Sequence, residues 1–286
     1  MHTVTKSLQD LVVEGRGKGY DDSKIRIILK EYIQDIMLYI LYNNIQTSTL
    51  IFYKGSSLRK IYDLDRFSED LDFENPDGMD LNIISEIIRE YFKEIGMTDV
   101  ECKVQESKNI TRITVKFPIA KEIGLSGYSN EKLHVKIEVN NALTGKYTTE
   151  LTSKMLRRYS VILKHYDLPT LFACKIVACL DRVYVKGKKK INIKGRDFYD
   201  LVWFINNTNA LPNEKKLLDV NKEYTVDNVF NLLDKKIGQI KSSDLLEDLR
   251  DLLEDGEYIV KWCDNFQDVY SSSKKRYFDR VNFSNK

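Results

Sequence analysis

The chain has few cysteines, and they follow no pattern. Four are scattered through 286 residues (Cys102, Cys174, Cys179 and Cys263), without the short paired spacings of a disulfide framework or a zinc site. The three histidines do not cluster with them. These absences argue against a disulfide-stapled domain and against structural zinc, and they favour a reducing compartment.

Long uncharged apolar runs are also missing. The longest apolar stretch, residues 25–42, carries Arg26, Lys30, Glu31 and Asp35, which would be costly in a bilayer and suit a helix in water. The first twenty residues mix charges with short apolar runs and lack the apolar core of a signal peptide. We therefore expect a cytoplasmic protein without a membrane partner.

No excess of one charge sign is present. The 45 Lys and Arg residues nearly balance the 43 Asp and Glu residues, and a formal charge of +2 gives no global field that would attract nucleic acid. Any binding of nucleic acid must therefore be local. The sequence also lacks repeats, low-complexity tracts and the lysine pattern of a P-loop.

The periodicity of the first half predicts a mixture of helices and strands. The segment Asp21-Asp22-Ser23 can cap a predicted helix over residues 25–41, and further helices are expected over residues 55–61 and 81–95. Short alternating or apolar runs predict strands over residues 49–53, 67–74, 100–105, 111–117 and 133–139.

From Tyr166 onward the period becomes helical. Pro169 begins a predicted helix that runs to about residue 184, followed by a basic glycine-containing loop, a helix from Arg196 to about residue 205, and three further helices. This change of period predicts two domains, residues 1–167 and residues 168–286.

Two carboxylates alternate on the predicted strand 67–74. Strand geometry points Asp70 and Asp72 to one face, while Leu71 and Phe73 point into the core. Magnesium requires oxygen ligands of this kind, completed by water and substrate phosphate. An Asp-x-Asp alone is weak evidence, because a solvated strand face shows the same pattern.

Two neighbouring features strengthen the metal hypothesis. Gly55 and Ser56 lie upstream at a predicted strand-to-helix turn, where free backbone N–H groups favour phosphate, although an ordinary helix cap fits them too. Glu138, on the predicted strand 133–139, joins the aspartates if the strands are neighbours. Otherwise it is a surface residue beside Lys132 and Lys136.

A glycine-serine turn, an Asp-x-Asp strand and a later strand carboxylate, in this order, resemble the DNA polymerase β-like nucleotidyltransferase superfamily. Four successive segments are similar to the motifs of AbiEii/AbiGii-type toxins, the nucleotidyltransferases of type IV toxin–antitoxin and abortive infection systems. The resemblance runs from about Thr49 to Phe204, and its motifs are residues 54–62, 66–73, 174–182 and 195–201.

The resemblance implies an α+β fold, a polymerase β-like core with a mixed sheet, followed by a mainly helical C-terminal domain, with substrate in the cleft between them. It implies a metal-dependent toxin that transfers a nucleoside monophosphate from an NTP to an RNA acceptor, the 3′ end of tRNA, with release of pyrophosphate. The expected cofactor is Mg²⁺ or Mn²⁺, and the expected protein partner is a cognate antitoxin.

The resemblance also assigns roles to residues. Read without it, Lys175 would be a snorkelling surface lysine, and Asp197 and Asp200 favourable charges at a helix N-terminus. With it, Lys175 contacts triphosphate and Asp197 lies beside it, whereas Asp200 is left without a firm role. The expected set is Asp70 and Asp72 for metal, Glu138 as an assistant or base, and Gly55, Ser56, Ser57, Arg59 and Lys175 for phosphate.

The densest basic segment lies between two of these motifs. It is either a solvated loop or a track for RNA phosphates, with Lys188, Lys189, Lys190, Lys194 and Arg196 as candidates. Three further cations could extend this basic patch, namely Arg59, Lys60 and Arg66.

Two other functions compete with RNA modification. The same core chemistry accepts a protein hydroxyl as the nucleophile. A catalytically silent nucleotide-binding or RNA-binding regulator is the alternative of another class, and the complete acidic pair argues against it because degenerate sites usually lose a carboxylate.

Overall fold

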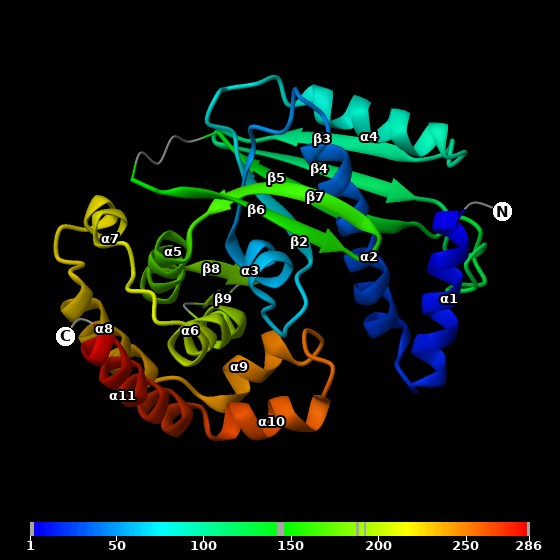
Figure 1. Ribbon diagram of the computed structural model, residues 1–286. Helices are drawn as coiled ribbons and strands as arrows, with labels where there is room; N and C mark the ends of the chain where they lie inside the picture. Colours follow the sequence, from blue (N-terminus) through cyan, green and yellow to red (C-terminus); the bar gives the residue numbers. More distant parts are fainter. Residues whose placement is uncertain (1–2, 142–145, 187–188, 192, 285–286) are drawn as a thin grey trace. The chain divides into compact units, whose positions relative to one another are not determined.

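The computed structural model describes residues 3–141, 146–186, 189–191 and 193–284 (Figure 1). The chain forms two compact units. Unit 1 comprises Met1–Asp63, Phe67–Leu143 and Thr149–His165, and unit 2 comprises Leu64–Arg66, Thr144–Thr148 and Tyr166–Lys286. Unit 2 therefore includes Leu64–Arg66, a short segment that lies in sequence just before the strand predicted over residues 67–74.

Unit 1 is built on a seven-stranded mixed sheet with the order β3-β4-β5-β2-β1-β7-β6. Strand β2 runs antiparallel to β1 and parallel to β5, so it lies in the middle of the sheet. The strands are β1 (Ile51–Tyr53), β2 (Asp70–Glu74), β3 (Glu101–Glu106), β4 (Ile110–Phe117), β5 (Leu133–Asn140), β6 (Thr149–Leu156) and β7 (Tyr159–Tyr166).

Four helices complete unit 1, namely α1 (Thr3–Gly17), α2 (Asp22–Tyr42), α3 (Lys54–Tyr62) and α4 (Asn82–Glu94). Asp21 caps α2 as expected, because its carboxylate accepts from the backbone N–H of Lys24 at 2.8 Å. Apolar residues of α1, α2 and α4 share one core cluster with the sheet, including Leu29 and Phe73, both fully buried. The predicted helices and strands of residues 25–139 are confirmed within a few residues at each end.

Strands β6 and β7 and helix α1 were not predicted. The pattern of β7 was readable in the sequence, because buried Val161 and Leu163 alternate with exposed Ser160 and Ile162. Strand β7 pairs in parallel with β1 through Phe52 and His165, so it extends the sheet on the side of β1 away from β2.

Unit 2 is mainly helical. Its helices are α5 (Leu168–Asp181), α6 (Gly195–Asn207), α7 (Glu214–Val220), α8 (Val226–Ile237), α9 (Ser242–Leu249), α10 (Gly256–Asp264) and α11 (Phe266–Ser284). Stacked Phe172 and Phe204, with ring centroids 4.7 Å apart, mark its core. No helix of the described residues is both long and apolar enough to span a membrane.

Two predictions for unit 2 were wrong. Five helices follow α6 in the described chain, not three, because side-chain caps at Asn213, Thr225 and Asp255 restart the chain after short breaks that periodicity does not resolve. The expected basic loop contains a small antiparallel ribbon, β8 (Tyr184–Lys186) with β9 (Lys189–Ile191).

Candidate active site

Three carboxylates share one face of the sheet in unit 1. Leu71 and Phe73 of β2 are fully buried, so the alternating Asp70 and Asp72 point to the opposite face. Strand β5 lies beside β2 in parallel, and Glu138 is the register partner of Asp72. Glu138 is thus a neighbour of the aspartates, the condition on which its functional interpretation depended.

Each of these carboxylates faces a cation. The Nζ of Lys54 lies 2.7 Å from Asp72 Oδ1, and the Nζ of Lys136 lies 4.0 Å from Asp70 Oδ1. Glu138 Oε1 accepts from Nε and Nη2 of Arg112 at 2.8 and 2.5 Å. The acidic face therefore carries nearby cations that a divalent ion would have to displace or share with substrate.

The electrostatics of Asp70 reflect this crowding. Burial raises the pKa of Asp70, and the Asp72 and Glu138 carboxylates raise it further against the opposing effect of Lys136. A carboxyl that is costly to keep charged gains the most from a cation beside it. The direction of the shift shows that Lys136 does not fully offset burial and the neighbouring carboxylates at Asp70.

The turn from β1 into α3 has an unusual backbone at Lys54. Its φ of 63° lies in the left-handed region, which costs a residue with a side chain about 1–3 kcal/mol. Such a backbone conformation persists only where the surrounding structure holds the residue in place. Burial opposes the charge of Lys54, but Asp72 and Tyr53 together outweigh burial and raise the pKa of the ammonium. Sequence reasoning did not assign Lys54, although it opens the 54–62 motif.

The residues after Lys54 begin helix α3. Gly55 is half-buried and Ser56 is fully buried, and the Ser56 hydroxyl has no hydrogen-bond partner among the described residues. The Ser57 hydroxyl, in contrast, donates to the Lys54 carbonyl at 2.9 Å. An unsatisfied buried hydroxyl at a helix N-terminus is suited to a phosphate oxygen.

The cations of α3 do not form an open basic surface. Arg59 pairs with Glu31 at 2.7 Å, and Lys60 pairs with Asp35 at 2.5 Å. Lys60 and Arg66 are 7% and 2% exposed. The idea that Lys60 and Arg66 extend an RNA-binding patch is therefore wrong, because both side chains are buried in ion pairs.

Unit 2 holds a second charged cluster. Lys175 Nζ of α5 lies 2.8 Å from Asp197 Oδ1 and 2.7 Å from Asp200 Oδ2 of α6. Arg66 donates from Nε and Nη2 to the two oxygens of Asp200 at 2.5 and 2.6 Å, and Arg182 lies 2.7 Å from Asp197. Asp200 therefore fastens α6 to both cations, which is a structural role.

Burial decides how this second cluster behaves. Lys175 is 7% exposed, so it is not a snorkelling surface lysine. Burial opposes its charge, but Asp197 and Asp200 outweigh that cost and raise the pKa of the Lys175 ammonium. Burial raises the pKa of Asp197, but Lys175 and Arg182 lower it by more, so the net shift is a decrease. Both groups are therefore held in their charged forms.

Helix α6 begins at a glycine for a steric reason. A Cβ at Gly195 would lie 2.4 Å from the carbonyl oxygen of Leu245, and backbone cannot move aside cheaply. We expect Gly195→Ala to destabilise unit 2 by about 1–3 kcal/mol. Trp203 and Trp262 are the only tryptophans and both belong to unit 2, so urea unfolding followed by tryptophan fluorescence measures this loss.

The control for this substitution is Gly256→Ala at the start of α10, where an added Cβ meets nothing within 4 Å. Equal unfolding midpoints for the two variants would show that the close approach to Leu245 does not destabilise Gly195→Ala.

The basic segment is described only in part. Lys188 lies outside the described residues, and Lys189 and Lys190 belong to β9. Lys194 is half-buried, and burial lowers the pKa of its ammonium. The backbone N–H of Arg196 donates to Asp248 at 2.9 Å.

The donor set of the acidic face fits magnesium in chemistry. Within the described ranges no cluster of three or more His, Cys, Asp or Glu side chains is arranged to hold a metal ion. Mg²⁺ is commonly bound through one or two carboxylates, with phosphate oxygens and water as the other ligands. Asp70 and Asp72 can supply such a pair.

One of the comparisons with known proteins identifies a family. A family model described as "Nucleotidyl transferase AbiEii toxin, Type IV TA system" matches residues 36–281. No curated protein matches the chain. Among solved structures, JHP933 from Helicobacter pylori is 17% identical with a TM-score of 0.49, covering 89% of this chain and 95% of that one. A candidate nucleotidyltransferase from Helicobacter pylori is also 17% identical with a TM-score of 0.49, covering 87% and 94%.

Proposed function

Because this chain belongs to the AbiEii family of type IV toxin–antitoxin nucleotidyltransferases, we propose that it transfers a nucleoside monophosphate from an NTP to RNA, at the 3′ end of tRNA. The family implies a cognate antitoxin and an NTP substrate. The observation that carries the proposal is the acidic face of Asp70, Asp72 and Glu138. The contact of Lys54 with Asp72 links this face to the turn at Gly55 and Ser56.

The proposed reaction joins the acceptor hydroxyl to the α-phosphorus of the NTP. The bond between the α-phosphorus and its bridging oxygen breaks, and pyrophosphate leaves. Mg²⁺ or Mn²⁺ held by Asp70 and Asp72 would neutralise charge on the phosphate oxygens. Glu138 would accept the hydroxyl proton once substrate draws Arg112 away from it. The amides of Gly55, Ser56 and Ser57 would bind the triphosphate, with Lys54 as an added cation.

The roles of Lys175 and Asp197 in triphosphate binding stay predictions from the resemblance. Their buried pairing supports a fixed position for the Lys175 ammonium. The basic residues near β9 stay candidates for RNA contact, since they are the densest local positive charge in a nearly neutral chain.

The test is a transfer assay with each of the four α-³²P-labelled NTPs against total RNA, purified tRNA and cell protein. We expect label in tRNA that depends on Mg²⁺ or Mn²⁺ and is removed by a 3′ exonuclease. Label only in protein would replace the RNA acceptor with a protein hydroxyl. Nucleotide binding without any transfer would favour the regulator.

Ser56 offers a sharper test of the phosphate turn. Because its buried hydroxyl has no partner among the described residues, Ser56→Ala should not lower the melting temperature. It should raise the KM for NTP about tenfold, the value of one hydrogen bond to a charged group. Steady-state kinetics with saturating tRNA measure the change.

Ser85→Ala is the matched control, because the Ser85 hydroxyl on α4 is also buried without a partner in the described chain. Its KM should equal that of the wild type. A normal KM for Ser56→Ala would exclude the Ser56 hydroxyl as a phosphate ligand.

A further inference from the structure

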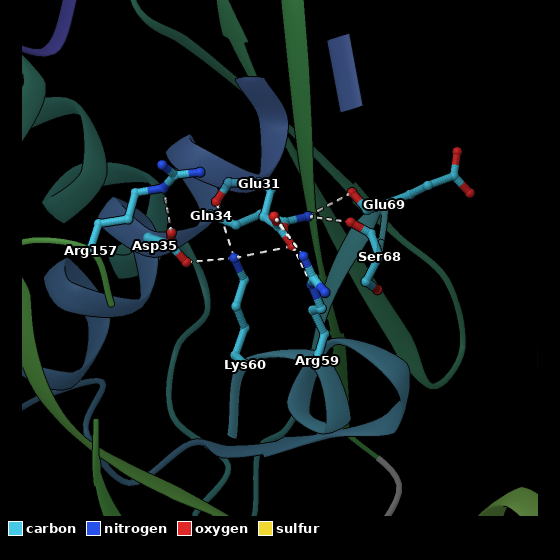
Figure 2. Close-up of polar contacts among 8 residues, drawn as sticks. All are labelled: Glu31, Gln34, Asp35, Arg59, Lys60, Ser68, Glu69 and Arg157. Carbon is cyan, nitrogen blue, oxygen red and sulfur yellow. Dashed lines mark hydrogen bonds and ion pairs between the residues drawn. The ribbon is translucent and has the colours of Figure 1, made fainter. Parts of the chain in front are cut away.

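Helix α2 carries a buried polar stripe beside its apolar core residues. The stripe consists of Glu31, Gln34 and Asp35, which are 7%, 0% and 4% exposed. Their spacing of three and four residues places them on one face of the helix. Figure 2 shows these side chains directed toward α3 on one side and toward the chain before β2 on the other.

Gln34 holds the backbone that leads into the acidic strand. Its Nε2 donates to the carbonyl oxygens of Ser68 and Glu69, both at 3.0 Å (Figure 2). Glu69 is the residue directly before Asp70. The side-chain amide thereby holds the two peptide units that directly precede Asp70.

This arrangement leaves the other end of the amide unsatisfied. Gln34 Oε1 is buried and has no hydrogen-bond partner within the described residues. Turning the amide over would place an oxygen against two carbonyl oxygens, so the present orientation is the favourable one. An unsatisfied buried oxygen is destabilising, and an apolar side chain of similar size would avoid that cost.

Glu31 and Asp35 form ion pairs with helix α3, which begins at the Gly55–Ser56 turn. Glu31 accepts from Arg59 Nε at 2.7 Å and from Nη2 at 3.3 Å. Lys60 Nζ donates to Asp35 Oδ1 at 2.5 Å and to the Glu31 carbonyl oxygen at 3.2 Å. Arg157 lies 3.3 Å from the second oxygen of Asp35 (Figure 2).

One rigid helix thus contacts both halves of the proposed site in unit 1. Buried ion pairs and half-satisfied amides contribute little net stability compared with apolar packing. Their geometric precision, however, is high, because each is fixed by two or more directional contacts. The stripe therefore contributes more to positioning the neighbouring segments than to the stability of the fold.

We propose that Gln34 is a positioning residue that aligns Asp70 for divalent-metal binding, while Glu31 and Asp35 align the Gly55–Ser56 turn through Arg59 and Lys60. This proposal rests on the metal role of Asp70 in the proposed function. It gives Arg59 a tethering role in place of the phosphate contact first expected for it.

Gln34→Met tests the proposal, because it keeps side-chain length, removes both donors and removes the unsatisfied oxygen. We expect a melting temperature equal to or above that of the wild type. The Mn²⁺ concentration for half-saturation, titrated by electron paramagnetic resonance in the presence of a non-hydrolysable NTP analogue, should rise about tenfold. The kcat/KM for transfer should fall about 10- to 100-fold.

Gln267→Met is the matched control. Gln267 also donates its amide to two carbonyl oxygens, those of Ile237 and Ile240 at 3.3 Å, but belongs to unit 2. Its substitution should leave Mn²⁺ half-saturation unchanged. Gln34→Asn, which keeps the amide but is one methylene too short to reach both carbonyls, should weaken Mn²⁺ binding as Gln34→Met does.

Wild-type Mn²⁺ half-saturation in both Gln34 variants would overturn the positioning role. Loss of activity in proportion to unfolded protein, with normal Mn²⁺ affinity in the folded fraction, would also overturn it. A wild-type protein without Mn²⁺ binding or transfer would refute the proposed function instead, so the two failures are distinguishable.

Discussion

Asp70→Asn is expected to lower kcat/KM for nucleotidyl transfer by at least about 10³-fold, because Asp70 is the proposed metal ligand and a bound metal stabilises charge in the transition state by several kcal/mol. The fold should not suffer. Burial and the neighbouring carboxylates raise the pKa of Asp70, so its charge is costly in the folded state. Removal of that charge should leave the melting temperature of the metal-free protein unchanged or higher.

The pH dependence of stability separates these effects. A carboxyl whose pKa rises on folding binds more protons in the folded state than in the unfolded state. The free energy of unfolding therefore falls as pH rises from the ordinary value of 3.8 to the raised value of Asp70. Asp70→Asn should lack this part of the decline, measured by circular dichroism in urea titrations across that interval.

Asp77→Asn, at an exposed aspartate just after β2, is the control for charge removal near the site. It should keep wild-type transfer activity. Full activity in Asp70→Asn would exclude Asp70 as a metal ligand.

The sequence was sufficient for the acidic face because strand alternation is a local property. Asp70 and Asp72 could be assigned to one face from Leu71 and Phe73 alone, and burial of both apolar residues confirms that prediction. The position of Glu138 opposite Asp72 required knowledge of which strands pair. Periodicity along one strand carries no such information.

The partners of the charged residues were the part that local patterns could not predict. Arg59 and Lys60 looked like exposed cations on a short helix, yet they pair with Glu31 and Asp35, more than twenty residues away in sequence, and Lys60 is buried. Lys175 looked like a surface lysine because the carboxylates that neutralise it lie on another helix. In both cases the decisive contact is non-local.

Lys54 shows where a local signal existed but was not used. A lysine directly before a glycine at a strand-to-helix turn must adopt whatever backbone the turn needs, and here its φ is 63°. A residue with a side chain is retained in that region only where its environment holds it. The contact with Asp72 identifies what holds it.

The buried cluster of unit 2 leads to the prediction with the largest effect on stability. Asp200 is fully buried and neutralises Arg66, which is 2% exposed. Burial opposes the charge of Arg66, and Asp200 outweighs that cost and raises the pKa of its guanidinium. Asp200→Leu would leave this guanidinium buried without its bidentate partner, which costs about 3–5 kcal/mol.

The double variant Asp200→Leu/Arg66→Met should recover the part of that loss that is due to Arg66, because it removes the stranded guanidinium together with its partner, while Lys175 keeps Asp197 as its carboxylate partner. Tryptophan fluorescence in urea reports on unit 2 through Trp203 and Trp262. Lys261→Ala, which breaks an exposed pair with Glu257, is the control and should not shift the unfolding midpoint. A double variant no more stable than Asp200→Leu would mean that Asp200 stabilises unit 2 by packing or by its pair with Lys175, and not by neutralising Arg66.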